Sequence, residues 1–213
     1  MKYYVRTTGE RDLSAYENLN YTPLYDYEHK PVKSFIEQMR IISKTNSLFM
    51  EDDIILCENF EERVQEVVKR FPNQVINFFF QPLAYLFTGK VKGEKFLYNQ
   101  CVYYPRGIAR KIADEMERLV EEGIKWTQYD EIQAVAMKNL GIDFINYRPC
   151  LVQHIGKNSL LGNNWIFDAK TIFFIDDLKG MNYDNAKLML DYAYKKYDEY
   201  GISYTRPRII PKK

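Results

Sequence analysis

The sequence has few of the residues that build stapled or metal-clustered folds, with three cysteines and two histidines in 213 residues. Cys57, Cys101 and Cys150 are odd in number and show no CxxC spacing, which argues against a disulfide framework and a cysteine zinc site. Thiols of this kind are typical of a reducing compartment, where they stay free and mostly buried. We therefore expect a cytoplasmic protein.

Charge of one sign and long apolar runs are also missing. The formal net charge is +1, so no global field attracts a polyanion. No apolar run approaches the roughly 20 residues that cross a bilayer, and the first residues lack the apolar segment of a signal peptide. We expect no membrane span. The exception in charge is the segment from Arg206 to Lys213, which has four cations and no acid. It is either a solvated terminus or a clamp on phosphate.

What the sequence does contain is an alternation of short apolar segments with amphipathic ones. This pattern predicts an α/β fold: a mixed sheet flanked by helices in a single domain, residues 1–181, with a C-terminal helix and basic tail, 182–213, packed on it. Residues 18–33 are rich in Tyr and Asn and contain two prolines, so we expect a loop there, with Ser34 as the cap of the next helix. The expected strands are 2–7, 48–50, 74–80, 97–104, 142–147 and 149–154; the expected helices are 34–42, 59–71, 107–122, 129–139 and 184–200.

Three acids interrupt the most apolar of these segments, SLFMEDDIILC, at Glu51, Asp52 and Asp53. They could be solvated turn residues, a Walker-B-type phosphate site, or ligands of a divalent cation that bridges a diphosphate. The apolar residues on both sides disfavour a solvated turn, because buried unpaired carboxylates are costly. The Walker reading requires GxxxxGK[ST], but Gly89-Lys90 is followed by Val91 and has no glycine five residues earlier. A cation site remains the preferred interpretation.

The segment FMEDDIILCENF resembles the metal-site strand of GT-A-fold glycosyltransferases, in particular the family-25 galactosyltransferases and the N-acetylglucosaminyltransferase IV group. Further segments in the same order resemble other parts of that fold: RTTGER after the first strand, NQCVYYPRGIARKI, YDEIQ and PCLVQHIGKNS. The resemblance extends over residues 2–160 and departs from the group at Glu51, where an Asp is usual. It implies a GT-A (Rossmann-like) fold.

The resemblance also implies roles for individual residues. Asp53 and His154 would bind the metal, Mn²⁺ or Mg²⁺, and an imidazole ligand favours Mn²⁺. Glu51 and Asp52 would divide between donor hydroxyls and support of the site, in either order. The remaining donor-binding candidates are Thr7, Thr8, Arg11, Lys157 and Ser159.

On the acceptor side, Asp130 and Glu131 begin a helix. Acids are common there because they suit the helix dipole. The functional interpretation is that Asp130 is the general base for an acceptor hydroxyl, with Glu131 as the rival. Tyr103, Trp126 and Tyr129 would form an acceptor pocket.

Together these features predict a metal-dependent, inverting glycosyltransferase that uses a nucleotide-sugar donor, a UDP-sugar. The expected acceptors are a saccharide or lipid-linked saccharide, or hydroxymethylated DNA, which the basic tail and the small size of the protein suggest. Two other classes stay open: a nucleotidyltransferase, and a non-catalytic protein of the same fold that binds a nucleotide or sugar.

Overall fold

The computed structural model describes residues 1–28, 30–57, 59–79, 89–96, 98–123, 129–147 and 150–154. Its strands are β1 (Lys2–Thr7), β2 (Tyr21–Tyr25), β3 (Ser47–Glu51), β4 (Ile54–Leu56), β5 (Val75–Asn77), β6 (Gly89–Val91), β7 (Cys101–Tyr104), β8 (Phe144–Asn146) and β9 (Val152–His154). Its α-helices are α1 (Pro31–Ile42), α2 (Phe60–Arg70), α3 (Ile108–Glu121) and α4 (Tyr129–Asn139), and short 3₁₀ turns lie at Ser14–Tyr16 and Gly93–Lys95. The expected helix 184–200 and the basic tail lie outside these ranges.

Seven strands form one mixed sheet in the order β2-β1-β3-β7-β5-β8-β6. Strands β2, β1 and β3 are parallel, β7 is antiparallel to both of its neighbours, and β8 is parallel to β5. The edge strand β6 is antiparallel to β8. A second, two-stranded sheet pairs β4 with β9. The predicted α/β class, a mixed sheet flanked by helices, is confirmed.

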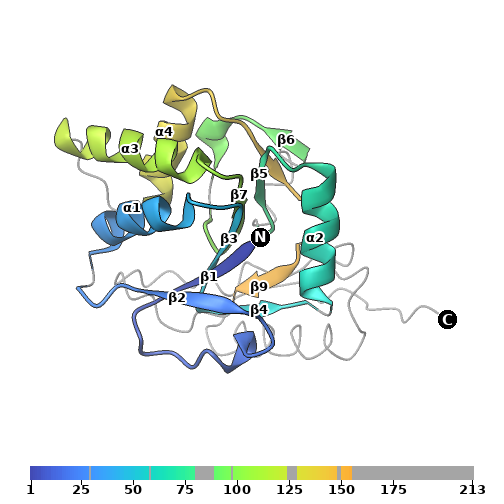
Figure 1. Ribbon diagram of the computed structural model, residues 1–213. Coiled ribbons are helices and arrows are strands. Elements are labelled where there is room, and N and C mark those ends of the chain that lie inside the picture. Colours follow the sequence, from blue (N-terminus) through green and yellow to red (C-terminus); the bar gives the residue numbers. More distant parts are fainter. Residues whose placement is uncertain are drawn as a thin grey trace, which may run out of the picture.

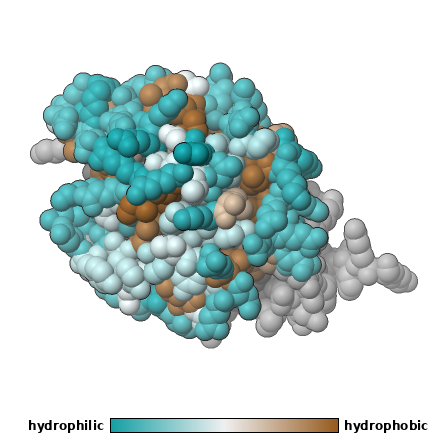
Figure 2. All heavy atoms as spheres, viewed as in Figure 1, coloured by the Kyte–Doolittle hydropathy of each residue, from teal (hydrophilic) through white to brown (hydrophobic). Residues whose placement is uncertain are grey.

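Helices cover both faces of the large sheet (Figure 1). Helices α1, α3 and α4 lie on one face, and α2 lies on the other. Alternate residues of the central strands divide between the two cores, as the period of a strand requires. Tyr4 and Phe49 pack toward the three helices, whereas Tyr3 and Leu48 pack toward α2. The outer surfaces of the helices are largely hydrophilic in the view of Figure 2.

The expected loop at residues 18–33 is wrong in two places. Strand β2 pairs in parallel with β1, and its Pro23 is tolerated because β2 is an edge strand that needs no hydrogen bond on its open side. Helix α1 begins at Pro31, with Lys30 and not Ser34 at the cap. Proline suits this first helical position because its φ is already near the helical value and its missing N–H would have no helical partner.

The acid triplet lies at the junction of the two sheets. Glu51 ends β3, Asp52 and Asp53 form the turn, and the chain then enters β4 of the small sheet. Apolar segments therefore flank the acids on both sides, as the sequence pattern indicates. All three cysteines are free and buried, and none of the described helices is long and apolar enough to cross a membrane.

Candidate functional site

The first feature of the site is a reversal in the strand order. From β1 the chain continues to β2 on one side, whereas from β3 it continues toward β5 on the other side. The neighbouring strands β1 and β3 are parallel, with Arg6 opposite Glu51, so both end at the same edge. In open α/β sheets, ligands bind at such a switch point, outside the carboxyl ends of the strands. The segment after β1 carries Thr7, Thr8 and Arg11, and the segment after β3 carries the acids.

Tyr16 fixes the turn that carries the acids. Its side chain is fully buried, and its hydroxyl donates a hydrogen bond to the Glu51 carbonyl at 2.6 Å. The Ile54 carbonyl lies 3.4 Å from the same hydroxyl, so one group contacts both ends of the turn. Burial raises the pKa of Tyr16, and the nearby Asp53 adds to this, so the hydroxyl stays protonated as a donor.

Arg11 contacts both carboxylates of the turn. Its Nη1 lies 2.6 Å from Asp52 Oδ1 and 2.8 Å from Asp53 Oδ2. The acid side chains are only 6% and 12% exposed, whereas that of Arg11 is 26% exposed. Burial lowers the pKa of Arg11, but the two acids outweigh it and the pKa lies above its ordinary value. One guanidinium thus serves two carboxylates that are both less exposed than it is.

Two oxygen atoms at this edge suit a ligand. Asp52 Oδ2 and the Thr8 hydroxyl oxygen are buried and have no hydrogen-bond partner within the described part of the chain. Thr7, in contrast, is satisfied, because its hydroxyl accepts the Gly9 N–H at 2.9 Å. A buried carboxylate oxygen without a donor is a ligand that hard cations accept.

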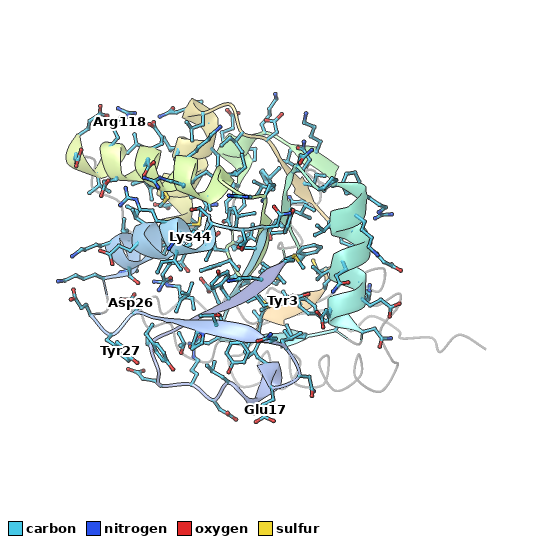
Figure 3. All side chains as sticks on the ribbon, in the orientation of Figure 1. Tyr3, Glu17, Asp26, Tyr27, Lys44 and Arg118 are labelled. Carbon is cyan, nitrogen blue, oxygen red and sulfur yellow. The ribbon has the colours of Figure 1, made fainter. Side chains whose placement is uncertain are left out.

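Glu51 lies in a different environment, which we call the Glu51 cluster: Arg6, Asp26, Glu51 and Tyr129. The Tyr129 hydroxyl donates to the Glu51 carboxylate, and Arg6 Nη1 lies 3.9 Å from Glu51 Oε1. Arg6 Nη2 donates to Asp26 Oδ2 at 3.0 Å, and the guanidinium lies 4.6 Å from the centre of the Tyr129 ring. Asp26 follows β2, at the place labelled in Figure 3. Glu51 and Asp52 therefore contact different cations.

Asp130 lies in the first turn of α4, next to this cluster. Burial raises its pKa, even though backbone hydrogen bonds from Tyr98 and Glu131 act in the opposite direction. The segment that contains Tyr98 also reaches the acids, because Gln100 accepts a backbone hydrogen bond from Glu51 at 3.1 Å. Glu131 is exposed. The structure thus brings Tyr129 into contact with Glu51, and Asp130 is the next residue of α4.

Other predicted site residues lie apart from this edge or outside the described ranges. Tyr103 is fully buried on the face that α2 covers, and its hydroxyl donates to the Pro72 carbonyl near the opposite edge, so it does not join Tyr129 in a pocket. The backbone of His154 pairs with Ile54, the residue after Asp53. The His154 side chain, Trp126, Lys157 and Ser159 are outside the described structure.

Three residues that were not predicted from the sequence also contribute to this edge: Arg6, Asp26 and Tyr16. Arg6 has a recognisable signal, since a cation in the apolar strand KYYVRT requires a buried partner. Asp26 directly follows a strand, as Asp52 does, but the sequence pattern predicts a loop there and not β2. Tyr16 carries no such signal.

Within the residues that the structure describes, no group of three or more His, Cys, Asp and Glu side chains is arranged to hold a metal ion. The two carboxylates of the turn would by themselves supply only part of a coordination shell. In comparisons with known proteins, no family model and no curated protein matches this sequence.

Proposed function

We propose that this protein is a metal-dependent GT-A-type glycosyltransferase that moves a sugar from a nucleoside-diphosphate donor, a UDP-sugar, to an acceptor hydroxyl with inversion. The observation that carries the proposal is the Asp52–Asp53 turn, which ends β3 at the switch point beside the segment after β1. Partly buried carboxylates at this place suit a donor whose diphosphate is neutralised by a cation.

The donor side uses residues of both segments. Asp53, with the side chain of His154, would hold Mn²⁺ or Mg²⁺, and Asp52 Oδ2 offers a further oxygen. Two carboxylates are a sufficient protein contribution for such an ion, because water and phosphate oxygens commonly complete its shell. When bound, the cation offsets the charge that develops on the leaving diphosphate. Thr8, Arg11, Lys157 and Ser159 would contact the phosphates.

The acceptor side uses Asp130 as base. The acceptor oxygen forms its bond to the anomeric carbon while the bond from that carbon to the diphosphate oxygen breaks, and the hydroxyl proton passes to Asp130. A raised pKa suits this role, because a base works best when its pKa lies near the operating pH. Tyr129 and Trp126 would line the acceptor pocket. The acceptor proposed is a saccharide or lipid-linked saccharide, with hydroxymethylated DNA as the variant that would use the basic tail.

Asp53→Asn tests the metal site. The amide keeps the size of the side chain but loses its charge, so we expect Mn²⁺-dependent UDP affinity to fall about 100-fold, measured by calorimetry. The matched control is Asp114→Asn, which changes an exposed acid on α3. Equal UDP affinity in both variants would remove the metal-site assignment.

A product assay separates the reaction classes. A transferase hydrolyses UDP-sugars slowly in the presence of Mn²⁺ when no acceptor is added. A nucleotidyltransferase would instead release pyrophosphate from a nucleoside triphosphate, and a binding protein would do neither while still binding UDP. The first result supports the proposal, and either of the others overturns it.

Asp130→Asn tests the base. We expect transfer to slow about 10²- to 10⁴-fold while UDP affinity stays unchanged, since the residue acts only on the acceptor. Glu131→Gln is the matched control in the next position. The opposite pattern would give the base role to Glu131.

A further inference from the structure

The contact of Arg11 with the acid turn bears on how the proposed donor site is filled. A single nitrogen, Nη1, lies within 2.8 Å of an oxygen from each of Asp52 and Asp53. A cation bound by these carboxylates would lie next to that guanidinium, and two positive groups so close repel each other. The contact seen here and a bound cation therefore compete for the same oxygens.

Of the two sides of this contact, the acids are the more firmly held. Their turn lies between β3, which is hydrogen-bonded on both sides, and β4, which pairs with β9, and Tyr16 contacts both of its ends. Arg11 comes from the irregular segment between β1 and the 3₁₀ turn at Ser14–Tyr16. Its side chain is the most exposed of the three and has several rotatable bonds. Arg11 can move away while its backbone stays in place.

We propose that Arg11 occupies the cation position when the donor is absent, and that it moves to the diphosphate when cation and donor bind together. This inference rests on the proposed function, because it assumes a cation and a diphosphate at this edge. A guanidinium forms strong paired hydrogen bonds with phosphate groups, as it does with carboxylates. Arg11 therefore exchanges its contacts with the two acids for contacts with the diphosphate and loses none. The cation alone offers Arg11 no new partner.

The exchange predicts coupled binding. Mn²⁺ alone must displace Arg11 without compensation and binds weakly, whereas Mn²⁺ and a nucleoside diphosphate strengthen each other's binding. Coupling between two ligands of one protein typically lies between about 5-fold and 150-fold, and it is reciprocal. Arg11 would thus make the protein select the loaded donor over the free ion.

The experiment measures Mn²⁺ binding by calorimetry with and without UDP in the wild type and in Arg11→Gln. Without the competing charge, Arg11→Gln should bind Mn²⁺ alone at least about 10-fold more tightly, and the coupling with UDP should shrink by a similar factor. Arg110→Gln, which removes an exposed arginine of α3, is the charge-matched control and should behave as the wild type. Unchanged or weaker binding of Mn²⁺ alone in Arg11→Gln overturns the inference.

A second variant and a second readout guard against misfolding. Arg11→Lys keeps the charge but not the planar fork, so its affinity for Mn²⁺ alone should lie between those of the wild type and Arg11→Gln. Thermal melting gives an independent measure, because Mn²⁺ should raise the midpoint more in either variant than in the wild type. An equal rise in all three proteins contradicts the exchange.

The outcomes also separate this inference from the function on which it rests. If no protein in the set binds Mn²⁺, even with UDP, then the metal-dependent transferase and the exchange both fall. If wild type and Arg11→Gln bind Mn²⁺ and UDP together with the same coupling, only the exchange falls. If UDP binds equally well without any metal and this binding needs Arg11, then Arg11 is a permanent substitute for the cation, and this result overturns both the metal dependence and the exchange.

Discussion

The acid triplet contributes to two regions, and in each of them one arginine contacts two carboxylates. The regions differ in how these charged side chains are held in place. In the Glu51 cluster, Arg6 serves Asp26 and Glu51; at the turn, Arg11 serves Asp52 and Asp53. In the cluster the Tyr129 hydroxyl and the Lys30 N–H add further donors. At the turn, Asp52 Oδ2 has no hydrogen-bond partner in the described part of the chain.

The two regions differ in the part of the chain that supplies the arginine. Arg6 is part of the central strand β1, and its side chain is 12% exposed beneath Tyr129, whose ring packs against Phe35 of α1. Arg11 belongs to an irregular segment and is more exposed. A carboxylate held by regular elements stabilises the fold, whereas one held by a movable side chain is available to a ligand. We therefore expect the charged residues of the cluster, Arg6, Asp26 and Glu51, to be structural and the turn to be functional.

Arg6→Met breaks the structural region and should have the largest effect on stability. It leaves two carboxylates, of which Asp26 is 5% exposed, without their cation. Removing one partner of a buried ion pair costs about 3–5 kcal/mol of unfolding free energy. Urea denaturation measures this loss, and Mn²⁺ should not restore it, in contrast to Arg11→Gln. Restoration of Arg6→Met by Mn²⁺ would show that the two regions are not distinct.

Tyr129→Phe removes one hydrogen bond from the same region and should have a smaller effect. The Glu51 carboxylate loses a donor while the ring and its contact with Arg6 remain, so we expect a loss of about 1–3 kcal/mol. The control is Tyr27→Phe, because Tyr27 is 69% exposed and should change stability by less than about 0.5 kcal/mol. Equal stability of both variants would mean that Glu51 does not depend on Tyr129.

The sequence was sufficient for the fold class and for the position of the acids. Strand β1 has the same bounds as predicted, and α4 does too, because alternation and helical spacing are local properties that a sequence displays directly. The position of the acids could be predicted because three adjacent charges between apolar residues are also a local pattern. Strand β2 was not predicted because its register is set by pairing with β1, and because its proline is more typical of a loop than of a strand.

The contacts between the side chains of the site could not be predicted from the sequence, for a related reason. Arg11 was selected as a donor-binding residue, but its contact with Asp52 joins residues that are 41 positions apart. The Glu51 cluster draws on four parts of the chain at once: β1, the residue after β2, the end of β3 and the start of α4. Such contacts follow from the order of strands in the sheet, and several strand orders are compatible with the same alternation of elements.

Asp130→Asn should change stability in a pH-dependent way. The pKa of Asp130 is raised by burial in the folded protein, so ionisation is easier in the unfolded chain. The stability of the wild type therefore falls as the pH rises from about 4, the value of an unfolded Asp, through the raised pKa. The variant lacks this fall and should melt at a higher temperature at pH 7, with no difference at the lowest pH. A variant that is less stable at pH 7 would contradict burial as the dominant effect.

We expect the smallest effect on stability at a third arginine, which also contacts two acids but lies on the surface. Arg40 of α1 contacts Asp114 at 3.0 Å and also Glu117, both on α3, and the two acids are about half exposed. Because water and salt screen these charges, Arg40→Met should lower the melting temperature by no more than about 2–4 °C. The difference from the wild type should shrink further in 1 M salt, where screening acts within about 3 Å. A loss as large as that of Arg6→Met would mean that burial is not what separates the structural cluster from an ordinary surface pair.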